Sequence, residues 1–160
     1  MKLVSTLAAA CTIFTVSSAV AIDKRTDPAG DFKLWGQTGT SKVYVYEEDS
    51  LAYLTTTAAN ATPLSFNGTA ILAPSGAALH IVPTSGTYEQ LGFSTEITGN
   101  EVTETFLWYG KLLMWENTST GWLDDLFWAK ATDTLGKYEL LWNSDFISQD
   151  AGAVGLKWSQ

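Results

Sequence analysis

Residues 64–72 have the sequence Leu-Ser-Phe-Asn-Gly-Thr-Ala-Ile-Leu, in which two short apolar runs flank Asn67-Gly68. Asn-Gly between apolar runs is the strongest short-range signal for a β-hairpin, because both residues accept the positive φ angles of a two-residue turn. A similar arrangement recurs around an acidic segment in residues 43–54 and around Gly110-Lys111 in residues 106–115. Short apolar runs separated by turn residues at close spacing predict antiparallel β structure.

The rest of the downstream chain continues this pattern. We expect a strand at residues 78–82, a hairpin over residues 94–105 around Gly99-Asn100, and later strands at residues 127–130, 137–142 and 153–158. Only Leu123–Lys130 is a candidate for a helical turn. About nine to eleven strands in this length predict an all-β fold, a single antiparallel β-sandwich, with a closed β-barrel or a β-trefoil as alternatives. No linker divides the chain.

The first residues have the layout of a secretory signal peptide. Lys2 supplies a positive charge, residues 3–16 are uncharged and mainly apolar, and small residues up to Ala21 form an A-x-A cleavage pattern. Lys24-Arg25 then resembles the dibasic site that fungal secretory proteases cut. We therefore expect a signal peptide at residues 1–21, a short propeptide at residues 22–25 and a single β domain at residues 26–160.

Processing at these sites changes the composition of the chain. Its one cysteine, Cys11, leaves with the signal peptide, so the expected mature domain has no disulfide and depends on its core. Six lysines face sixteen carboxylates over residues 26–160, a net charge of −10, and no arginine remains. Such a chain repels phosphate backbones, which argues against a nucleic-acid partner. Residues 156–160 are not a hydrophobic tail, so we expect no lipid anchor.

Three N-glycosylation sequons follow from the expectation of export. They begin at Asn60, Asn67 and Asn117. Acceptor asparagines lie on surface loops of secreted proteins, and all three fall in predicted turns or loops. Asn67 at a turn tip and Asn117 in a polar run are favoured over Asn60, whose sequon is followed at once by Pro63.

Catalytic and metal chemistry has little support in the sequence. His80 is the only histidine, and one histidine without cysteine excludes ordinary zinc sites, so we expect neither metal nor cofactor. A strand histidine with a local hydrogen bond is favoured over a catalytic triad. Paired carboxylates remain the enzymatic alternative, because glycoside hydrolases use two. The two acidic clusters are Glu47-Glu48-Asp49 and Asp124-Asp125.

Tryptophan is more informative, since the chain has seven. Most of them are expected in the core, because indole rings bury large areas. Four lie between Trp108 and Trp128, however, and Trp115 and Trp122 flank the polar segment 116–121, where exposure is most plausible. Aromatic rings exposed on β modules stack on sugar rings, so Trp115 and Trp122 are the candidate carbohydrate-binding residues.

Scattered segments resemble small fungal secreted proteins of the PhiA-like cell-wall group. The resemblance rests on four segments: Phe32-Lys33-Leu34, Leu91-Gly92-Phe93, the hairpin around Gly110, and Gly152-Ala153-Val154-Gly155-Leu156. It implies a role in the cell wall and in development, without defined catalytic residues. The sequence thus predicts a secreted, non-enzymatic cell-wall or extracellular β protein whose partners are cell-wall polysaccharide or a host protein. A carbohydrate-binding module is the second hypothesis, and a small carbohydrate-active enzyme the third.

Overall fold

The computed structural model describes residues 27–147 and 150–160. The predicted signal peptide and propeptide, with Ala21, Lys24 and Arg25, lie outside the described residues, and their processing stays a prediction. Within the described ranges the chain forms strands and one short 3₁₀ helix, η1. No helix in this part of the chain is long and apolar enough to cross a membrane.

The described strands follow one another at short intervals along the chain. They are β1 (Lys33–Thr38), β2 (Ser41–Glu48), β3 (Leu51–Thr55), then, after η1 (Ala58–Asn60), β4 (Ser65–Phe66), β5 (Ile71–Leu72), β6 (Ala78–His80), β7 (Tyr88–Gln90), β8 (Gly92–Ser94), β9 (Phe106–Tyr109), β10 (Leu112–Asn117), β11 (Trp122–Asp124), β12 (Phe127–Ala131), β13 (Lys137–Asn143), β14 (Ala151–Ala153) and β15 (Lys157–Ser159).

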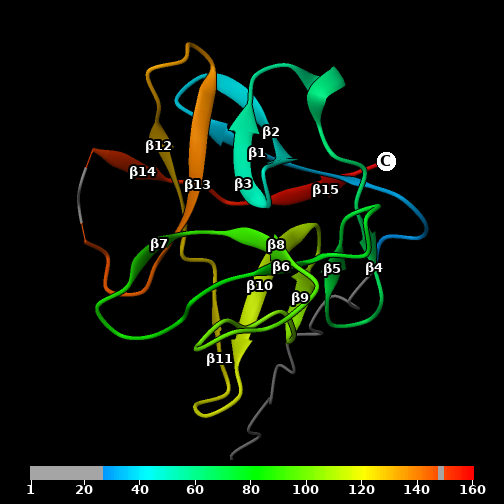
Figure 1. Ribbon diagram of the computed structural model, residues 1–160, viewed down its shortest axis with the longest axis vertical. Helices are drawn as coiled ribbons and strands as arrows, with labels where there is room; N and C mark the ends of the chain where they lie inside the picture. The colour runs from blue at the N-terminus through cyan, green and yellow to red at the C-terminus, as the bar shows by residue number, and fades with distance from the viewer. Residues whose placement is uncertain (1–26, 148–149) are drawn as a thin grey trace, which may run out of the picture.

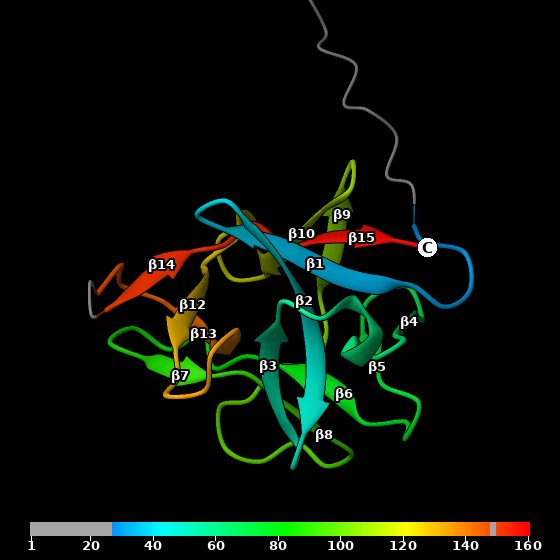
Figure 2. The same ribbon diagram turned by 90° about the horizontal axis from the view of Figure 1, so that it is seen from above.

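All of these strands join one antiparallel sheet. Its main path runs β11-β10-β15-β1-β2-β3-β8-β6-β5-β4, and β13 branches from β3 to reach β7, β12 and β14. The sheet curls into a half-barrel (Figures 1 and 2). The prediction of an all-β antiparallel fold is confirmed. The continuous curled sheet lies between the predicted sandwich and its barrel alternative.

Three predicted hairpins are confirmed. Residues 67–70 connect β4 and β5 as a four-residue loop rather than a two-residue turn, and in it the Asn67 side chain accepts a hydrogen bond from the Ala70 N–H at 2.9 Å. Asp49 and Ser50 connect β2 and β3 with φ angles of 53° and 65°, the left-handed pair that a two-residue turn requires. Gly110-Lys111 connects β9 and β10.

Two local predictions are wrong. Residues 95–105 form no hairpin around Gly99-Asn100; instead Val102 makes an isolated bridge to Ile81. Leu123–Lys130 contains no helical turn, because the end of β11 and most of β12 occupy it, with Asp125 and Leu126 between them. In both places long-range pairing partners, which the local sequence does not reveal, decide the conformation.

Seven aromatic side chains of the described residues are buried in the interior: Phe32, Phe93, Phe106, Trp108, Trp115, Phe127 and Trp142. Phe32 and Phe66 meet Trp108 edge to face at 5.5 and 5.7 Å between ring centroids. Trp142 stands between Trp115 and Phe127 in the same manner, at 5.8 and 5.1 Å. Edge-to-face pairs stabilise a core beyond the area they bury, and the second cluster also supports the site described next.

Candidate functional site

The β10–β11 hairpin places four side chains of interest on one face. Trp115 pairs with Asp124, and Asn117 pairs with Trp122, in antiparallel register. Residues opposite each other in an antiparallel pair, and residues two apart in a strand, point to the same side. The hairpin therefore gathers Trp115, Asn117, Trp122 and Asp124 on a single face, while Leu123 and Glu116 lie on the other.

The two candidate sugar-binding tryptophans differ sharply in exposure. Trp122 is 73% exposed near the tip of the hairpin, whereas Trp115 is only 7% exposed and packs against Trp142. The predicted exposure of Trp115 is therefore wrong, and sugar binding by either ring stays a prediction. Trp115 is part of the core beneath the site, and Trp122 alone offers an open ring face for stacking.

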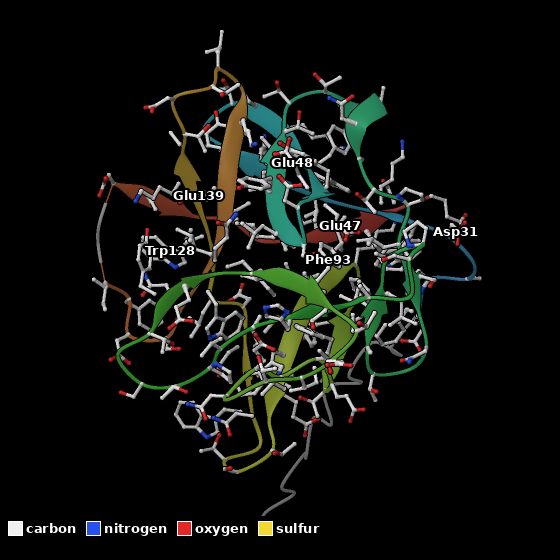
Figure 3. The ribbon with its side chains drawn as sticks, viewed as in Figure 1. Asp31, Glu47, Glu48, Phe93, Trp128 and Glu139 are labelled. Carbon is white, nitrogen blue, oxygen red and sulfur yellow. The ribbon has the colours of Figure 1, made fainter. Side chains whose placement is uncertain are left out.

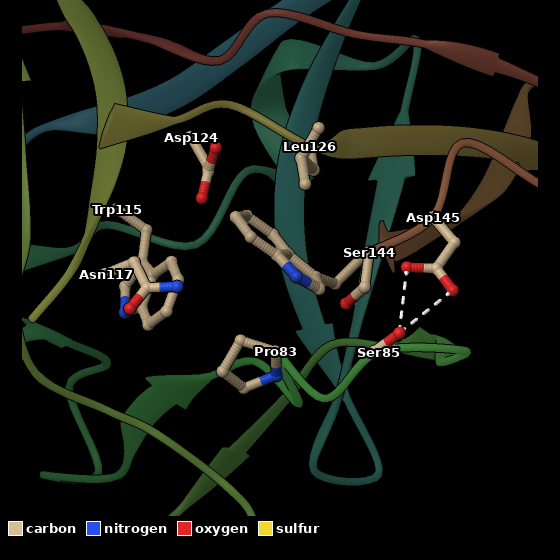
Figure 4. A pocket seen from close by; sticks show the side chains of 9 residues that line it. Pro83, Ser85, Trp115, Asn117, Asp124, Leu126, Ser144 and Asp145 are labelled. Atoms are coloured by element: carbon tan, nitrogen blue, oxygen red, sulfur yellow. Dashed lines mark hydrogen bonds between the residues drawn. The ribbon is translucent and has the colours of Figure 1, made fainter. Parts of the chain in front are cut away.

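A cleft of about 160 Å³ lies against this face of the hairpin. Asn117 and Asp124 line one side of it, and Trp115 and Trp142 contribute aromatic surface. Residues from two distant loops complete the lining (Figure 4). The lining residues are Pro83, Ser85, Trp115, Asn117, Asp124, Leu126, Trp142, Ser144 and Asp145.

The far wall of the cleft is held by hydrogen bonds between these two loops. The Gly86 N–H donates to the Asp145 carboxylate at 2.7 Å, and the Ser85 hydroxyl contacts the same carboxylate at 3.3 Å. The hydroxyls of Ser144 and Thr87 are 2.9 Å apart. These bonds join segments that are about sixty residues apart in sequence, so the polar groups of this wall have defined positions before any ligand binds.

The pKa of Asp124, on the hairpin side of the cleft, is shifted by its surroundings. Partial burial raises the pKa of Asp124 above its ordinary 3.8, and the neighbouring Asp125 raises it further. The indole N–H groups of Trp115 and Trp142 are buried and have no hydrogen-bond acceptor among the described residues. The cleft itself combines the acceptors of Asp124 and Asp145 and the hydroxyls of Ser85 and Ser144 beside aromatic surface, a mixture that suits a polyhydroxylated ligand.

No family model, curated protein or solved structure matches this chain. Its function is therefore inferred from its own residues and geometry. The resemblance to the PhiA-like group stays a hypothesis based on the sequence.

The sequence-predicted catalytic groups are dispersed. His80 lies in β6, and its Nε2 is 3.7 Å from Glu101. Burial lowers the pKa of His80, an effect that Glu101 partly opposes. Glu48 forms an ion pair with Lys137, and Asp49 lies in the β2–β3 turn. No group of three or more histidine, cysteine or acidic residues within residues 27–147 and 150–160 could hold a metal ion.

The three sequons occupy different settings. Asn67 is exposed at its turn, and Asn60 is exposed at the end of η1. Asn117 is half-buried and lines the cleft, where its side chain accepts a hydrogen bond from the Ser119 N–H at 3.1 Å. Glycosylation of these residues stays a prediction, and for Asn117 it has a consequence for the site.

One wall of the cleft carries sequence signals and the other does not. Asn117 belongs to a sequon, and Asp124 belongs to an acidic pair. Pro83, Ser85, Ser144 and Asp145 carry no motif, and nothing in their local sequence connects residues 83–86 with residues 144–145. Only the packing of these loops brings them opposite the β10–β11 hairpin.

Proposed function

We propose that this chain is a secreted, non-enzymatic β protein of the cell wall or extracellular matrix that binds carbohydrate at the β10–β11 cleft. The observation that carries the proposal is the position of Trp122. It is 73% exposed on the same hairpin face as Asn117 and Asp124, which line the cleft. An open indole face beside an amide and a carboxylate is the combination that recognises a sugar ring, by stacking and by hydrogen bonds.

The size of the cleft supports a small neutral unit rather than a long segment of polymer. A volume of about 160 Å³ corresponds to roughly five water molecules of liquid. That space suits a single sugar unit, with further units of a chain lying over Trp122. Asp124 and Asp145 are acceptors when ionised and match hydroxyl donors, whereas an anionic sugar would be repelled by them. Weak single-site binding becomes effective on an insoluble polymer through many contacts at once.

The test compares two neighbouring exposed residues of the same strand. Trp122→Ala removes the stacking ring, and Leu123→Ala removes an exposed side chain from the opposite face of the hairpin. We expect Trp122→Ala to weaken binding to neutral β-glucan or chitin oligosaccharides about five- to tenfold, and Leu123→Ala to leave it unchanged. Melting temperatures of both variants should equal that of the parent.

Two results would overturn the proposal. One is a parent protein that binds none of the neutral oligosaccharides in titration calorimetry or pull-down. The other is an equal loss of binding in the Trp122→Ala and Leu123→Ala variants, which would show that the hairpin rather than the indole matters.

Hydrolysis is the second candidate function, favoured by one observation. Asp124 and Asp145 line the same cleft from different elements, and the pKa of Asp124 is raised by burial and then by Asp125. Glycoside hydrolases use two carboxylates, of which the proton donor has the raised pKa. Release of reducing ends from an oligosaccharide, abolished in Asp124→Asn, would establish an enzyme; binding without release would establish the binding protein.

A further inference from the structure

A second surface, which shares no lining residue with the β10–β11 cleft, has a distinct composition. It is the outward face of the neighbouring strands β15, β1, β2, β3, β13 and β12. The buried residues Leu34, Val43, Val45 and Leu54 define the inward side of these strands. The alternate residues therefore point outward.

Four aromatic side chains follow one another across this face. Trp35 pairs directly with Tyr44, and Tyr46 pairs directly with Tyr53, so that the row crosses β1, β2 and β3. The rings of Tyr46 and Tyr53 lie 5.7 Å apart. All four are only partly buried. We call this row the aromatic row.

Lysines border the aromatic row on both sides. The Nζ of Lys42 lies 4.0 Å from the centre of the Trp35 ring, Lys157 lies 5.6 Å from the same ring, and Lys137 lies 4.0 Å from Tyr53. Long lysine stems cover the rings while their ammonium groups stay in water. Lys33, two residues before Trp35, and Lys130, opposite Glu139, point to the same face.

The charge of this face is opposite to that of the chain. Five of the six lysines within residues 27–147 and 150–160 lie on it. Two carboxylates of its strands point to the same face, Glu48 and Glu139, which Figure 3 labels. Among the described residues, Lys137 is the lysine of this face that has a carboxylate partner, Glu48. The remaining four lysines leave a cationic surface on a chain with a net charge of −10 over residues 26–160.

The aromatic row ends in a groove of about 400 Å³. Tyr46, Glu48 and Lys137 belong both to the face and to the groove, and three consecutive threonines, Thr55–Thr57, supply hydroxyl groups. Hydroxyl and amide groups both donate and accept hydrogen bonds, as sugar hydroxyls do. A phosphate offers acceptors only, and the chain has no arginine here to hold one in a two-pronged contact.

We propose that the aromatic row and its groove bind an acidic polysaccharide, a polymer of uronic acids. The rings stack on the sugar units, the lysines pair with the carboxylates, and the threonine groove holds hydroxyl groups. This surface is separate from the β10–β11 cleft, shares no lining residue with it, and differs from it in the charge of its ligand. The proposal therefore does not depend on the neutral-sugar site.

The test uses soluble polygalacturonate and alginate, with dextran as the neutral polymer. We expect the parent to bind the acidic polymers and to lose affinity as salt is raised, because screening weakens contacts between exposed charges. The double variant Lys42→Gln with Lys157→Gln should lose about tenfold or more in affinity, and Trp35→Ala about fivefold. Lys111→Gln is the matched control, since Lys111 lies over Trp158 outside this face.

The outcomes separate the two sites. Trp122→Ala should leave polygalacturonate binding unchanged, while the double lysine variant should leave neutral-oligosaccharide binding unchanged. The proposal is overturned if the parent binds neither acidic polymer, or if Lys111→Gln loses as much affinity as the double variant. It is also overturned if anionic lipid vesicles or DNA bind this face more tightly than the polyuronates.

Discussion

Trp115 and Trp142 meet edge to face, with ring centroids 5.8 Å apart and planes inclined at 81°. This contact joins the β10–β11 hairpin to the long strand β13 behind the candidate cleft. Trp122, seven residues further along the chain, does not join two strands in this way and is exposed. Trp115→Ala should therefore lower the free energy of unfolding by about 3–5 kcal/mol, and Trp122→Ala should change it by less than about 0.5 kcal/mol. Denaturant unfolding of the two variants checks this; similar losses in both would contradict the assigned burial.

Gly36 of β1 packs closely against the segment that precedes β15. A β-carbon at this position would press on the Val154 side chain and lie 3.2 Å from the carbonyl oxygen of Gly155. Gly36→Ala should therefore cost about 1–3 kcal/mol of stability through overpacking. Gly152→Ala is the matched control, because a β-carbon there has nothing within 4 Å. An unchanged melting temperature for Gly36→Ala would contradict the predicted close packing.

His80 gives the fold a pH dependence whose sign is defined. Burial lowers the pKa of His80 below its ordinary 6.5, and Glu101 partly opposes the shift. The unfolded chain therefore takes up a proton at a higher pH than the folded chain does. Stability should be full above about pH 6.5 and should fall as the pH drops through that value toward the lower pKa of the folded state.

Variants at both partners test this dependence by thermal melting. His80→Gln should lose the part of the pH dependence that lies near and below pH 6.5. Glu101→Gln should steepen it, because the opposing charge is removed. The mechanism fails if the melting curve of His80→Gln follows the parent at every pH.

Glycosylation of Asn117 would place a sugar at the mouth of the cleft. When the protein is secreted from a eukaryotic host, we expect glycans on Asn67 and Asn117, and the fold should survive their enzymatic removal. Binding of neutral oligosaccharides should be weaker in the glycosylated protein than after deglycosylation, because Asn117 lines the cleft. Peptide mapping together with titration checks both statements. Unmodified Asn67 and Asn117, or identical binding before and after treatment, would contradict them.

The hairpins with short turns could be predicted because their information is local. Gly68 and Gly110 have positive φ angles of 110° and 60°, which glycine adopts without strain, and the apolar residues on either side alternate or cluster as strands do. The same reasoning failed at residues 95–105, where turn residues at Gly99-Asn100 are present but the following chain bridges to Ile81 instead of folding back on its neighbour.

The sequence by itself determined the all-β antiparallel class, the acidic charge and the abundance of tryptophan, because these depend on composition and on contacts between neighbours. It suggested Trp122 as a binding residue but could not separate it from Trp115. Only the tertiary structure decided that Trp115 is buried while Trp122 is exposed. It also decided that Ser85 and Asp145 lie in one cleft, and that side chains from three strands form the aromatic row. The physical reason is that the burial of a side chain, and the residues it lies opposite, depend on which distant strands pack together. Strand pairing is set by the whole curled sheet rather than by any one segment.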